Sequence, residues 1–318
     1  MRFSALQHPP DAPGHSAGTS VAQSSAWLTL VDQDFDSRVV LAPGRGGLTR
    51  SFSVAGRELL YLDEATFADP EKNVRGGMPV LFPSPGRLNG DRWQRDGSQG
   101  LLPQHGFARN DPWQVLSVST QGAACAELQL VARPDRYLQY PWRFKLALTF
   151  QLRATTLRVQ SSVTNLDDRP LPYALGFHPY FAVHDKTRAR VLSNARQAYD
   201  NVRKQRVSVS ASDLQAGLHA GRELDLHLLD HSRNACALQL ADGAAIALRA
   251  SQAFARWVIW TLDDRPFVCV EPWTASADAL NTGELLQWVA PGATGDEWME
   301  ICWRPAPQAS HRDGSQGI

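Results

Sequence analysis

The amino-acid sequence predicts an all-β fold, a large antiparallel β-sandwich. Three observations predict it: apolar and polar positions alternate, turn residues recur at close intervals, and long helical periodicity is absent. The clearest alternation covers residues 143–153, where every second residue from Phe144 to Leu152 is apolar. A period of two over this length is typical of a strand with one face in the core. Residues 157–163 repeat the pattern after a short break, so we expect a hairpin.

The other expected strands are shorter runs of apolar or alternating residues. They cover residues 26–31, 37–41, 48–54, 127–131, 236–240, 245–249, 257–261 and 267–271. Turn residues separate them, at 55–56, 165–170, 242–243 and 263–266. The composition does not shift within residues 25–304, so we expect one domain there. Residues 1–24 and 305–318 lack periodicity and are expected to be a disordered N-terminal tail and a flexible C-terminal tail.

Composition excludes several classes of function. The chain has 318 residues, and 32 Lys and Arg balance 32 Asp and Glu, so the formal net charge is zero. A neutral chain without a basic block has no electrostatic reason to bind nucleic acid or an anionic membrane. No stretch approaches the roughly 20 apolar residues of a membrane-spanning helix, and the N-terminus lacks a signal-peptide core. We therefore expect a cytoplasmic protein, monomeric or homodimeric, that binds neither nucleic acid nor membrane.

The four cysteines indicate neither a disulfide framework nor a zinc finger. They are Cys125, Cys236, Cys269 and Cys302, without a C-x-x-C pair or zinc-finger spacing. Most have apolar neighbours, as Cys269 does in Phe-Val-Cys-Val. We interpret them as reduced core cysteines, and expect no metal site.

Three short segments each place one proton-transferring residue among glycine, proline and aromatic neighbours. They are Leu102-Pro-Gln-His-Gly-Phe-Ala-Arg109, Gly176-Phe-His-Pro-Tyr-Phe181 and Cys269-Val-Glu-Pro-Trp-Thr274. His105, His178 and Glu271 are therefore candidates for paired general acid and base work. Aromatic rings suit the apolar face of a pyranose, and Trp113 and Trp273 lie next to the candidate residues.

Each histidine also has a purely structural interpretation. His178 among aromatic residues is compatible with a hydrogen-bonded core histidine, and His105 with a β-turn beside a solvated Arg109. A functional interpretation of His105 is favoured by Gly106, which lets the backbone approach a ligand. Gln104 and Arg109 would add directional donors there.

The sequence around Glu271 favours a functional role more strongly than the sequence around either histidine does. It follows an apolar strand and precedes Pro272, which we expect to end the strand. A carboxylate in apolar surroundings is costly unless it is paired or functional, and burial would raise its pKa toward a value useful for catalysis. A structural salt bridge to an arginine is the alternative.

Four motifs in order resemble the aldose 1-epimerase (galactose mutarotase-like) family, including its glucose-6-phosphate 1-epimerase branch. They are Arg75-Gly-Gly-Met-Pro-Val-Leu-Phe-Pro83, Pro103-Gln-His-Gly-Phe-Ala-Arg109, Gly176-Phe-His-Pro-Tyr-Phe181 and Cys269-Val-Glu-Pro-Trp-Thr274. The resemblance extends from about residue 27 to 303. It implies a β-supersandwich, a cleft for a monosaccharide or sugar phosphate, no cofactor, and interconversion of the α and β anomers of a hexose or hexose 6-phosphate.

The resemblance also implies roles for individual residues. His178 would be the general acid toward the ring oxygen O5, Glu271 the general base toward the O1 hydroxyl, and His105 an assisting residue. Arg75 and Arg109 would bind either a phosphate or sugar hydroxyls, a choice that the sequence leaves open.

Further substrate contacts are expected around these residues. Gln104, Phe107 and Trp273 lie within the matching motifs. By the same resemblance, Asp200 corresponds to an acidic residue that bonds sugar hydroxyls in that family.

Three other functions compete with an epimerase. A non-catalytic carbohydrate-binding module would share the aromatic cleft but would not need His178 and Glu271 together. A hydrolase or lyase on a related sandwich would use two carboxylates, and Asp200 is the only contender for the second. A cupin-type metal site would need a closely spaced His-x-His pair, which His105 and His178 do not form.

Overall fold

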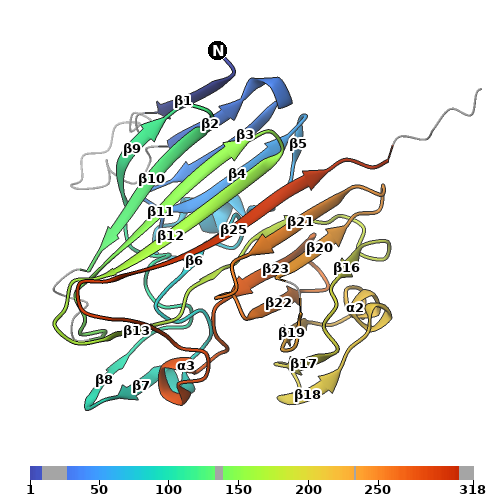
Figure 1. The fold of residues 1–318 in the computed structure, drawn as a ribbon. Coiled ribbons are helices and arrows are strands. Elements are labelled where there is room, and N and C mark those ends of the chain that lie inside the picture. Colours follow the sequence, from blue (N-terminus) through green and yellow to red (C-terminus); the bar gives the residue numbers. More distant parts are fainter. Residues whose placement is uncertain (9–26, 133–138, 233, 308–318) are drawn as a thin grey trace, which may run out of the picture.

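The computed structural model describes residues 1–8, 27–132, 139–232 and 234–307. The chain is mostly β, with 49% in strands and 8% in helices, and its sheets are antiparallel. The predicted all-β sandwich is thus confirmed. Figure 1 shows the long strands running side by side across the molecule.

Three sheets build the fold. The small sheet contains β1 (Phe3–His8), β2 (Trp27–Asp32), β3 (Ser37–Ala42), β4 (Leu48–Val54) and β5 (Arg57–Glu58), in that order. The first large sheet has the order β16 (Arg190–Leu192), β20 (Ala235–Gln239), β21 (Ala245–Ala250), β25 (Thr294–Arg304), β12 (Thr156–Asn165), β11 (Phe144–Arg153), β10 (Ala124–Val131) and β9 (Gln114–Ser119). The second large sheet has the order β18 (Gln205–Ser208), β17 (Gln197–Asp200), β19 (Leu224–Leu228), β22 (Arg256–Thr261), β23 (Phe267–Trp273), β14 (Gly176–Phe177) and β6 (Val80–Leu81), and β15 (Tyr180–Ala182) also pairs with β23.

Short elements connect these sheets. They are the strand pairs β7 (Arg92–Arg95) with β8 (Ser98–Leu101) and β13 (Leu171–Tyr173) with β24 (Gln287–Val289), the helices α1 (Glu64–Ala68), α2 (Ala211–Gly217) and α3 (Ala279–Thr282), and the 3-10 turns η1 (Gln33–Phe35) and η2 (Asn89–Asp91). Within the described ranges, no helix is long and apolar enough to cross a membrane.

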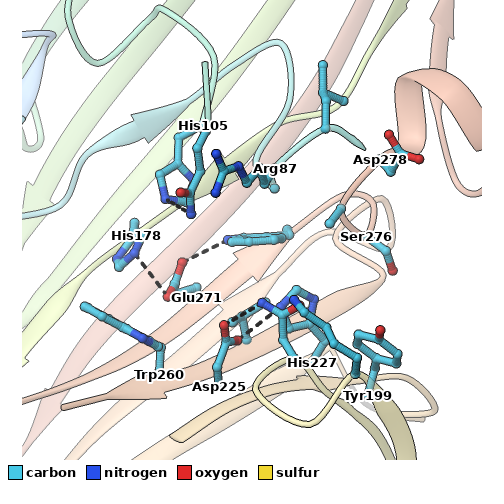
Figure 2. Close-up of a pocket in the computed structure, with 18 of the residues that line it drawn as sticks. Arg87, His105, His178, Tyr199, Asp225, His227, Trp260, Glu271, Ser276 and Asp278 are labelled. Atoms are coloured by element: carbon cyan, nitrogen blue, oxygen red, sulfur yellow. Dashed lines mark hydrogen bonds and ion pairs between the residues drawn. The ribbon is translucent and has the colours of Figure 1, made fainter. Parts of the chain in front are cut away.

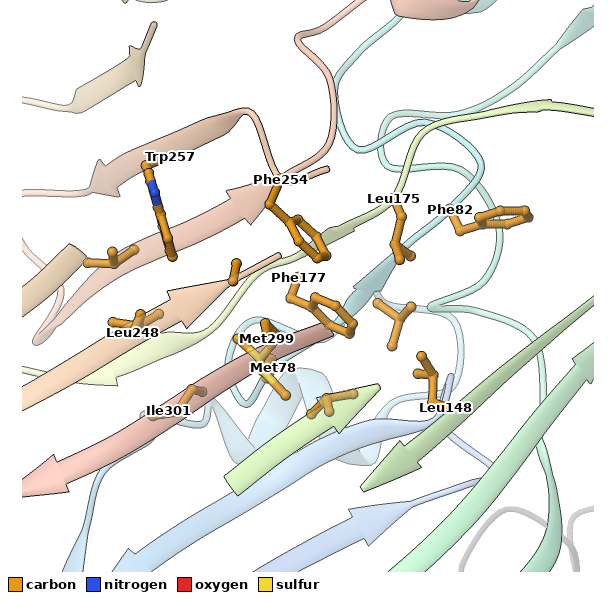
Figure 3. Packing of buried hydrophobic residues seen from close by; sticks show 14 of the residues in the cluster. Met78, Phe82, Leu148, Leu175, Phe177, Leu248, Phe254, Trp257, Met299 and Ile301 are labelled. Atoms are coloured by element: carbon orange, nitrogen blue, oxygen red, sulfur yellow. The ribbon is translucent and has the colours of Figure 1, made fainter. Parts of the chain in front are cut away.

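The main core lies where the inner faces of the sheets meet. Figure 3 shows Phe177 of the second large sheet next to Met299 of the first, and Trp257 and Ile301 belong to the same buried cluster. All four are buried. Along β25 the buried positions Met299 and Ile301 alternate with less buried ones, as expected for a strand with one face in the core.

Two local expectations need correction. Residues 3–8 form β1, which pairs with β2 from Phe3 opposite Asp32 to His8 opposite Trp27, so part of the expected N-terminal tail belongs to a sheet. Residues 9–26 and 308–318 lie outside the described part. Pro272 does not end its strand: Glu271 and Trp273, on either side, keep their pairing with β22, because proline removes only its own N–H donor.

Candidate active site

A cavity of about 1100 Å³ brings the three predicted proton carriers together. Its walls come from the second large sheet and from the loops around Arg75, Arg109 and Asp278. Figure 2 shows His105, His178 and Glu271 close together, with Asp225 and His227 beside Glu271 on the same sheet. Residues far apart in the sequence therefore share one surface.

The alternation of β23 aims Glu271 into this cavity. Val268 and Val270 point into the main core, whereas Cys269 and Glu271 point to the opposite face. Glu271 is only 1% exposed, and its Oε2 accepts a hydrogen bond of 3.0 Å from Nε1 of Trp273. Burial raises the pKa of Glu271 well above its ordinary value, the nearby charge of Asp225 adds to the rise, and the Trp273 hydrogen bond opposes it.

Strand register places His178 across from Glu271. Gly176 pairs with Trp273 and Tyr180 with Cys269, so counting inward from both pairs sets the two residues opposite one another. Nε2 of His178 lies 3.4 Å from Oε1 of Glu271. The imidazole stacks on the ring of Tyr180, with centroids 4.6 Å apart and planes at 12°. It is 6% exposed, and burial, together with the charges of His105, Arg109 and Arg75, lowers its pKa well below the ordinary value.

The pKa shifts of Glu271 and His178 have one joint consequence. Both favour the uncharged form of the residue, because water no longer solvates the charge. When the two residues hold one proton between them, burial therefore favours the arrangement with that proton on the carboxyl group. The ion pair, with a carboxylate and an imidazolium, has the same net charge and differs only in the position of the proton.

His105 lies beside this pair in a fixed tautomer. Its ring meets that of His178 edge to face, with centroids 5.5 Å apart. Nδ1 contacts the carbonyl of Pro85, which can only accept, so Nδ1 carries the proton. Burial, and secondarily the charge of Arg109, lowers the pKa of His105 to about 3. Its Nε2 is therefore an unprotonated acceptor at neutral pH, within 3.3 Å of Nε2 of Gln104.

Backbone geometry explains why this loop contains glycine. His105 and Gly106 both have a positive φ, of 73° and 69°. A Cβ at Gly106 would lie 2.1 Å from the carbonyl oxygen of Phe82. Glycine thus allows the close approach of two backbone segments that holds His105 in place.

Arg75, Arg109 and Gln104, which are expected from the sequence to contact substrate, line the cavity. Arg109 donates to the carbonyl of Gln104 at 3.3 Å, and its Nε is buried without a hydrogen-bond partner. No ion pair links either arginine to a carboxylate within the described ranges. Both are close enough to His178 to lower its pKa. The cavity therefore has two unneutralised guanidinium groups near the imidazole.

Two predicted substrate contacts lie elsewhere. Asp200 does not line the cavity: its Oδ1 accepts from the backbone N–H groups of Val202 and Arg203, in the turn that follows β17. Asp200 therefore stabilises a turn, as short acidic side chains often do. Phe107 is buried in the main core, 2% exposed, with its ring 6.1 Å from that of Phe144, so it cannot stack on a ligand.

The two tryptophans expected to contact a sugar lie in different environments. Trp113 is buried and donates to the carbonyl of Ala108, which rules out the expected sugar contact. Trp273 lines the cavity, with its ring 5.1 Å from that of His227 and 6.2 Å from that of His105.

Asp225 and His227 are cavity residues that the sequence reasoning missed. Nε2 of His227 lies 3.2 Å from Oδ1 of Asp225, and Asn201 donates to Oδ2 of Asp225 at 2.6 Å. Burial raises the pKa of Asp225, but the close contact with His227 and the hydrogen bond from Asn201 outweigh it, so the pKa is lowered and the group is a carboxylate. The sequence feature that could have identified them is the alternation Leu-Asp-Leu-His-Leu over residues 224–228, which forms β19.

One cluster on the described part of the chain has the composition of a metal site. A ligand atom from each of His178, Cys269 and Glu271 lies within 4.8 Å of the other two. All four cysteines are free thiols, with Cys236 and Cys269 buried.

Comparison with solved structures identifies the class of fold. The Slr1438 protein from Synechocystis sp. PCC 6803 is 31% identical, with a TM-score of 0.85 over 93% of this chain and 98% of that one. Galactose 1-epimerase from Lactobacillus acidophilus NCFM is 13% identical, with a TM-score of 0.73 over 96% of this chain and all of the other. The fold is therefore galactose mutarotase-like.

Sequence relatives give the family. The aldose 1-epimerase family profile matches residues 30–301, and the chain belongs to that family. The plasmid-encoded LacX protein of Lactococcus lactis subsp. lactis is 26% identical over 245 residues, which are 69% of this chain and 80% of that protein. A Cenchrus ciliaris protein named "Putative glucose-6-phosphate 1-epimerase" is 32% identical over 147 residues, which are 43% of this chain and 41% of the other.

Proposed function

We propose that the protein is a mutarotase that interconverts the α and β anomers of a hexose 6-phosphate. The observation that carries the proposal is the buried His178–Glu271 pair, 3.4 Å apart on the wall of a cavity large enough for a sugar. Family membership supports the reaction class. The choice of a phosphorylated substrate rests on the two arginines.

The reaction requires one proton to leave the sugar and another to enter it. Glu271 takes the proton of the O1 hydroxyl while His178 gives a proton to O5, the C1–O5 bond breaks, and C1=O1 forms. Rotation about C1–C2 then presents the other face of the aldehyde. Ring closure reverses both transfers, so the enzyme returns to its starting protonation state.

Burial of the pair assists ring opening. The step starts from the carboxylate and imidazolium and ends with the carboxylic acid and neutral imidazole. Because desolvation favours the uncharged forms of both Glu271 and His178, it favours the direction in which the protons move. The same preference makes the reactive ion pair a minor species of the empty site.

His105 would support the transfer as a neutral acceptor. Because Nδ1–H donates to the Pro85 carbonyl, Nε2 of His105 carries a lone pair and no proton. His105 lines the cavity. A sugar hydroxyl that replaces the Gln104 amide can donate to Nε2, which orients the ring without adding charge. The carboxylate of Asp225, in contact with His227 and Asn201, would accept hydrogen bonds from further sugar hydroxyls, two strands away from Glu271 on the same sheet.

The position of the arginines fits a phosphate on C6. C6 is attached to C5, which is bonded to O5, so its substituent lies near the residue that protonates O5. Arg75 and Arg109 are the two arginines whose positive charges lower the pKa of His178, so both lie near its imidazole. Guanidinium groups form paired hydrogen bonds with phosphate oxygens, and the buried Nε of Arg109 has no hydrogen-bond partner in the protein.

The test follows the anomeric protons by exchange NMR. Glucose 6-phosphate, glucose and galactose are compared with a blank, because the anomers also interconvert spontaneously. Acceleration with glucose 6-phosphate above that with either free sugar is expected. Acceleration of a free sugar alone would replace the phosphate assignment, and no acceleration by folded protein would favour a carbohydrate-binding module.

A further inference from the structure

Cys269 lies at the base of the proposed catalytic pair but has no part in its proton transfers. It precedes Glu271 by two residues on β23, so both side chains point to the same face. It is fully buried and does not line the cavity, and its strand partner is Tyr180, whose ring stacks on His178. The thiol thus sits behind the imidazole and the carboxylate as seen from the cavity.

The spacing of these three side chains approaches that of a tetrahedral metal site. Zinc binds His nitrogen and carboxylate oxygen at about 2.0–2.2 Å and thiolate sulfur at about 2.3 Å, which puts neighbouring ligand atoms about 3.5 Å apart. Nε2 of His178 and Oε1 of Glu271 are already 3.4 Å apart. All three ligand atoms lie within 4.8 Å of one another, so the sulfur must approach by about 1 Å, which a small side-chain rotation supplies.

We propose that His178, Cys269 and Glu271 form an inhibitory binding site for Zn²⁺ or a similar thiophilic divalent cation. One nitrogen, one sulfur and one oxygen suit zinc, whereas Mg²⁺ and Ca²⁺ require oxygen ligands. His178 and Glu271 line the cavity and Cys269 does not, so the fourth position faces the cavity and takes water. The Cys269 thiol releases its proton to solvent as the sulfur–metal bond forms.

Metal binding at this site would stop mutarotation. The metal occupies the imidazole nitrogen that would donate to O5 and the carboxylate oxygen that would accept from O1. This inhibition rests on the proposed function, whereas the binding itself does not. The metal is therefore an inhibitor and not a cofactor, and removing it leaves the enzyme active.

Cobalt is the probe that separates binding from activity. Co²⁺ replaces Zn²⁺ in such sites, and its bond to a thiolate gives a charge-transfer absorption band. We expect this band on titrating the intact protein with Co²⁺, with one equivalent bound and displacement by Zn²⁺. Cys269→Ala should abolish the band and weaken Zn²⁺ binding by more than about tenfold, measured by calorimetry.

Cys236→Ala is the matched control, because Cys236 is also a fully buried free cysteine but lies on β20. It should keep the band, and its activity should stay sensitive to Zn²⁺. Cys269→Ala should keep the activity of the parent enzyme and lose that sensitivity; if it unfolds, Cys269→Ser serves in its place.

A missing thiolate band in the intact protein overturns the site, as does Zn²⁺ binding that Cys269→Ala leaves unchanged. A Cys269-dependent band in a protein that accelerates no anomer exchange would support the metal site and reject the mutarotase.

Discussion

The indole N–H of Trp273 controls how often the proposed catalytic pair is in its reactive form. It donates to Oε2 of Glu271 at 3.0 Å, and this hydrogen bond stabilises the carboxylate over the carboxylic acid. Trp273→Phe removes the donor and keeps an aromatic ring in the cavity. A buried hydrogen bond to a charged group contributes about 1.5–3 kcal/mol, so the share of pairs with an ionised Glu271 should fall roughly 10- to 100-fold.

The pH dependence of kcat/KM distinguishes this effect from lost packing. The pKa of Glu271 is raised and that of His178 is lowered, so between the two values the pair holds one proton, mainly on the carboxyl group. Removing the indole N–H raises the pKa of Glu271 further. The rate between the two pKa values falls, and the alkaline limb of the profile moves to higher pH. The rates of variant and parent converge at still higher pH, where both have an ionised Glu271.

Trp260→Phe is the control for this experiment. Trp260 also lines the cavity, but its Nε1 donates to Glu223 at 2.8 Å and not to Glu271. The alkaline limb of the kcat/KM profile of Trp260→Phe should lie at the same pH as that of the parent. If Trp273→Phe lowers kcat/KM by the same factor at every pH, the indole acts by packing alone, and the charge argument for Glu271 is wrong.

Three further predictions test the site and its support. His178→Asn and Glu271→Gln should each slow anomer exchange by about 10²- to 10⁴-fold, measured by NMR, with melting temperatures near that of the parent; near-parental rates in either would reject the acid/base assignment. Arg75→Ala should reduce kcat/KM for glucose 6-phosphate by roughly 10- to 100-fold and leave glucose nearly unaffected, whereas equal losses would reject a phosphate contact. Gly106→Ala should lower the free energy of unfolding by more than about 2 kcal/mol in urea titrations, because its Cβ would lie 2.1 Å from a backbone oxygen, while Gly97→Ala, also at positive φ but in open space, should cost less; equal costs would contradict the steric argument.

The sequence predicted most of the core strands because their burial follows a period of two. Residues 143–153 were expected as a strand, and β11 covers Phe144–Arg153. Short strands such as β14 and β15 were missed, since two or three residues cannot display a period. β1 was missed for a different reason: its burial is partial, and what defines it is the pairing with β2.

The site was predictable where a residue's neighbours in the sequence are also its neighbours in space. His105, His178 and Glu271 belong to such segments, and all three line the cavity. Asp225 belongs to an alternating strand without glycine or proline, so its role depends on which face of β19 meets the cavity. Asp200 shows the converse, because its own turn supplies the donors that satisfy its carboxylate.

Strand register places the two proposed proton carriers, His178 and Glu271, next to one another although 93 residues separate them in the sequence. Because Gly176 pairs with Trp273 and Tyr180 with Cys269, the backbone itself sets His178 opposite Glu271. A slip of β23 by one residue would turn Glu271 into the core now filled by Val270 and expose that valine to the cavity. Burying a carboxylate among apolar side chains costs several kcal/mol, so the hydrophobic pattern that stabilises the sheet also fixes the geometry of the pair. The distance between His178 and Glu271 is therefore a consequence of the fold, and variants that weaken the packing of Val268 and Val270 should lose the proposed activity before they lose the sheet.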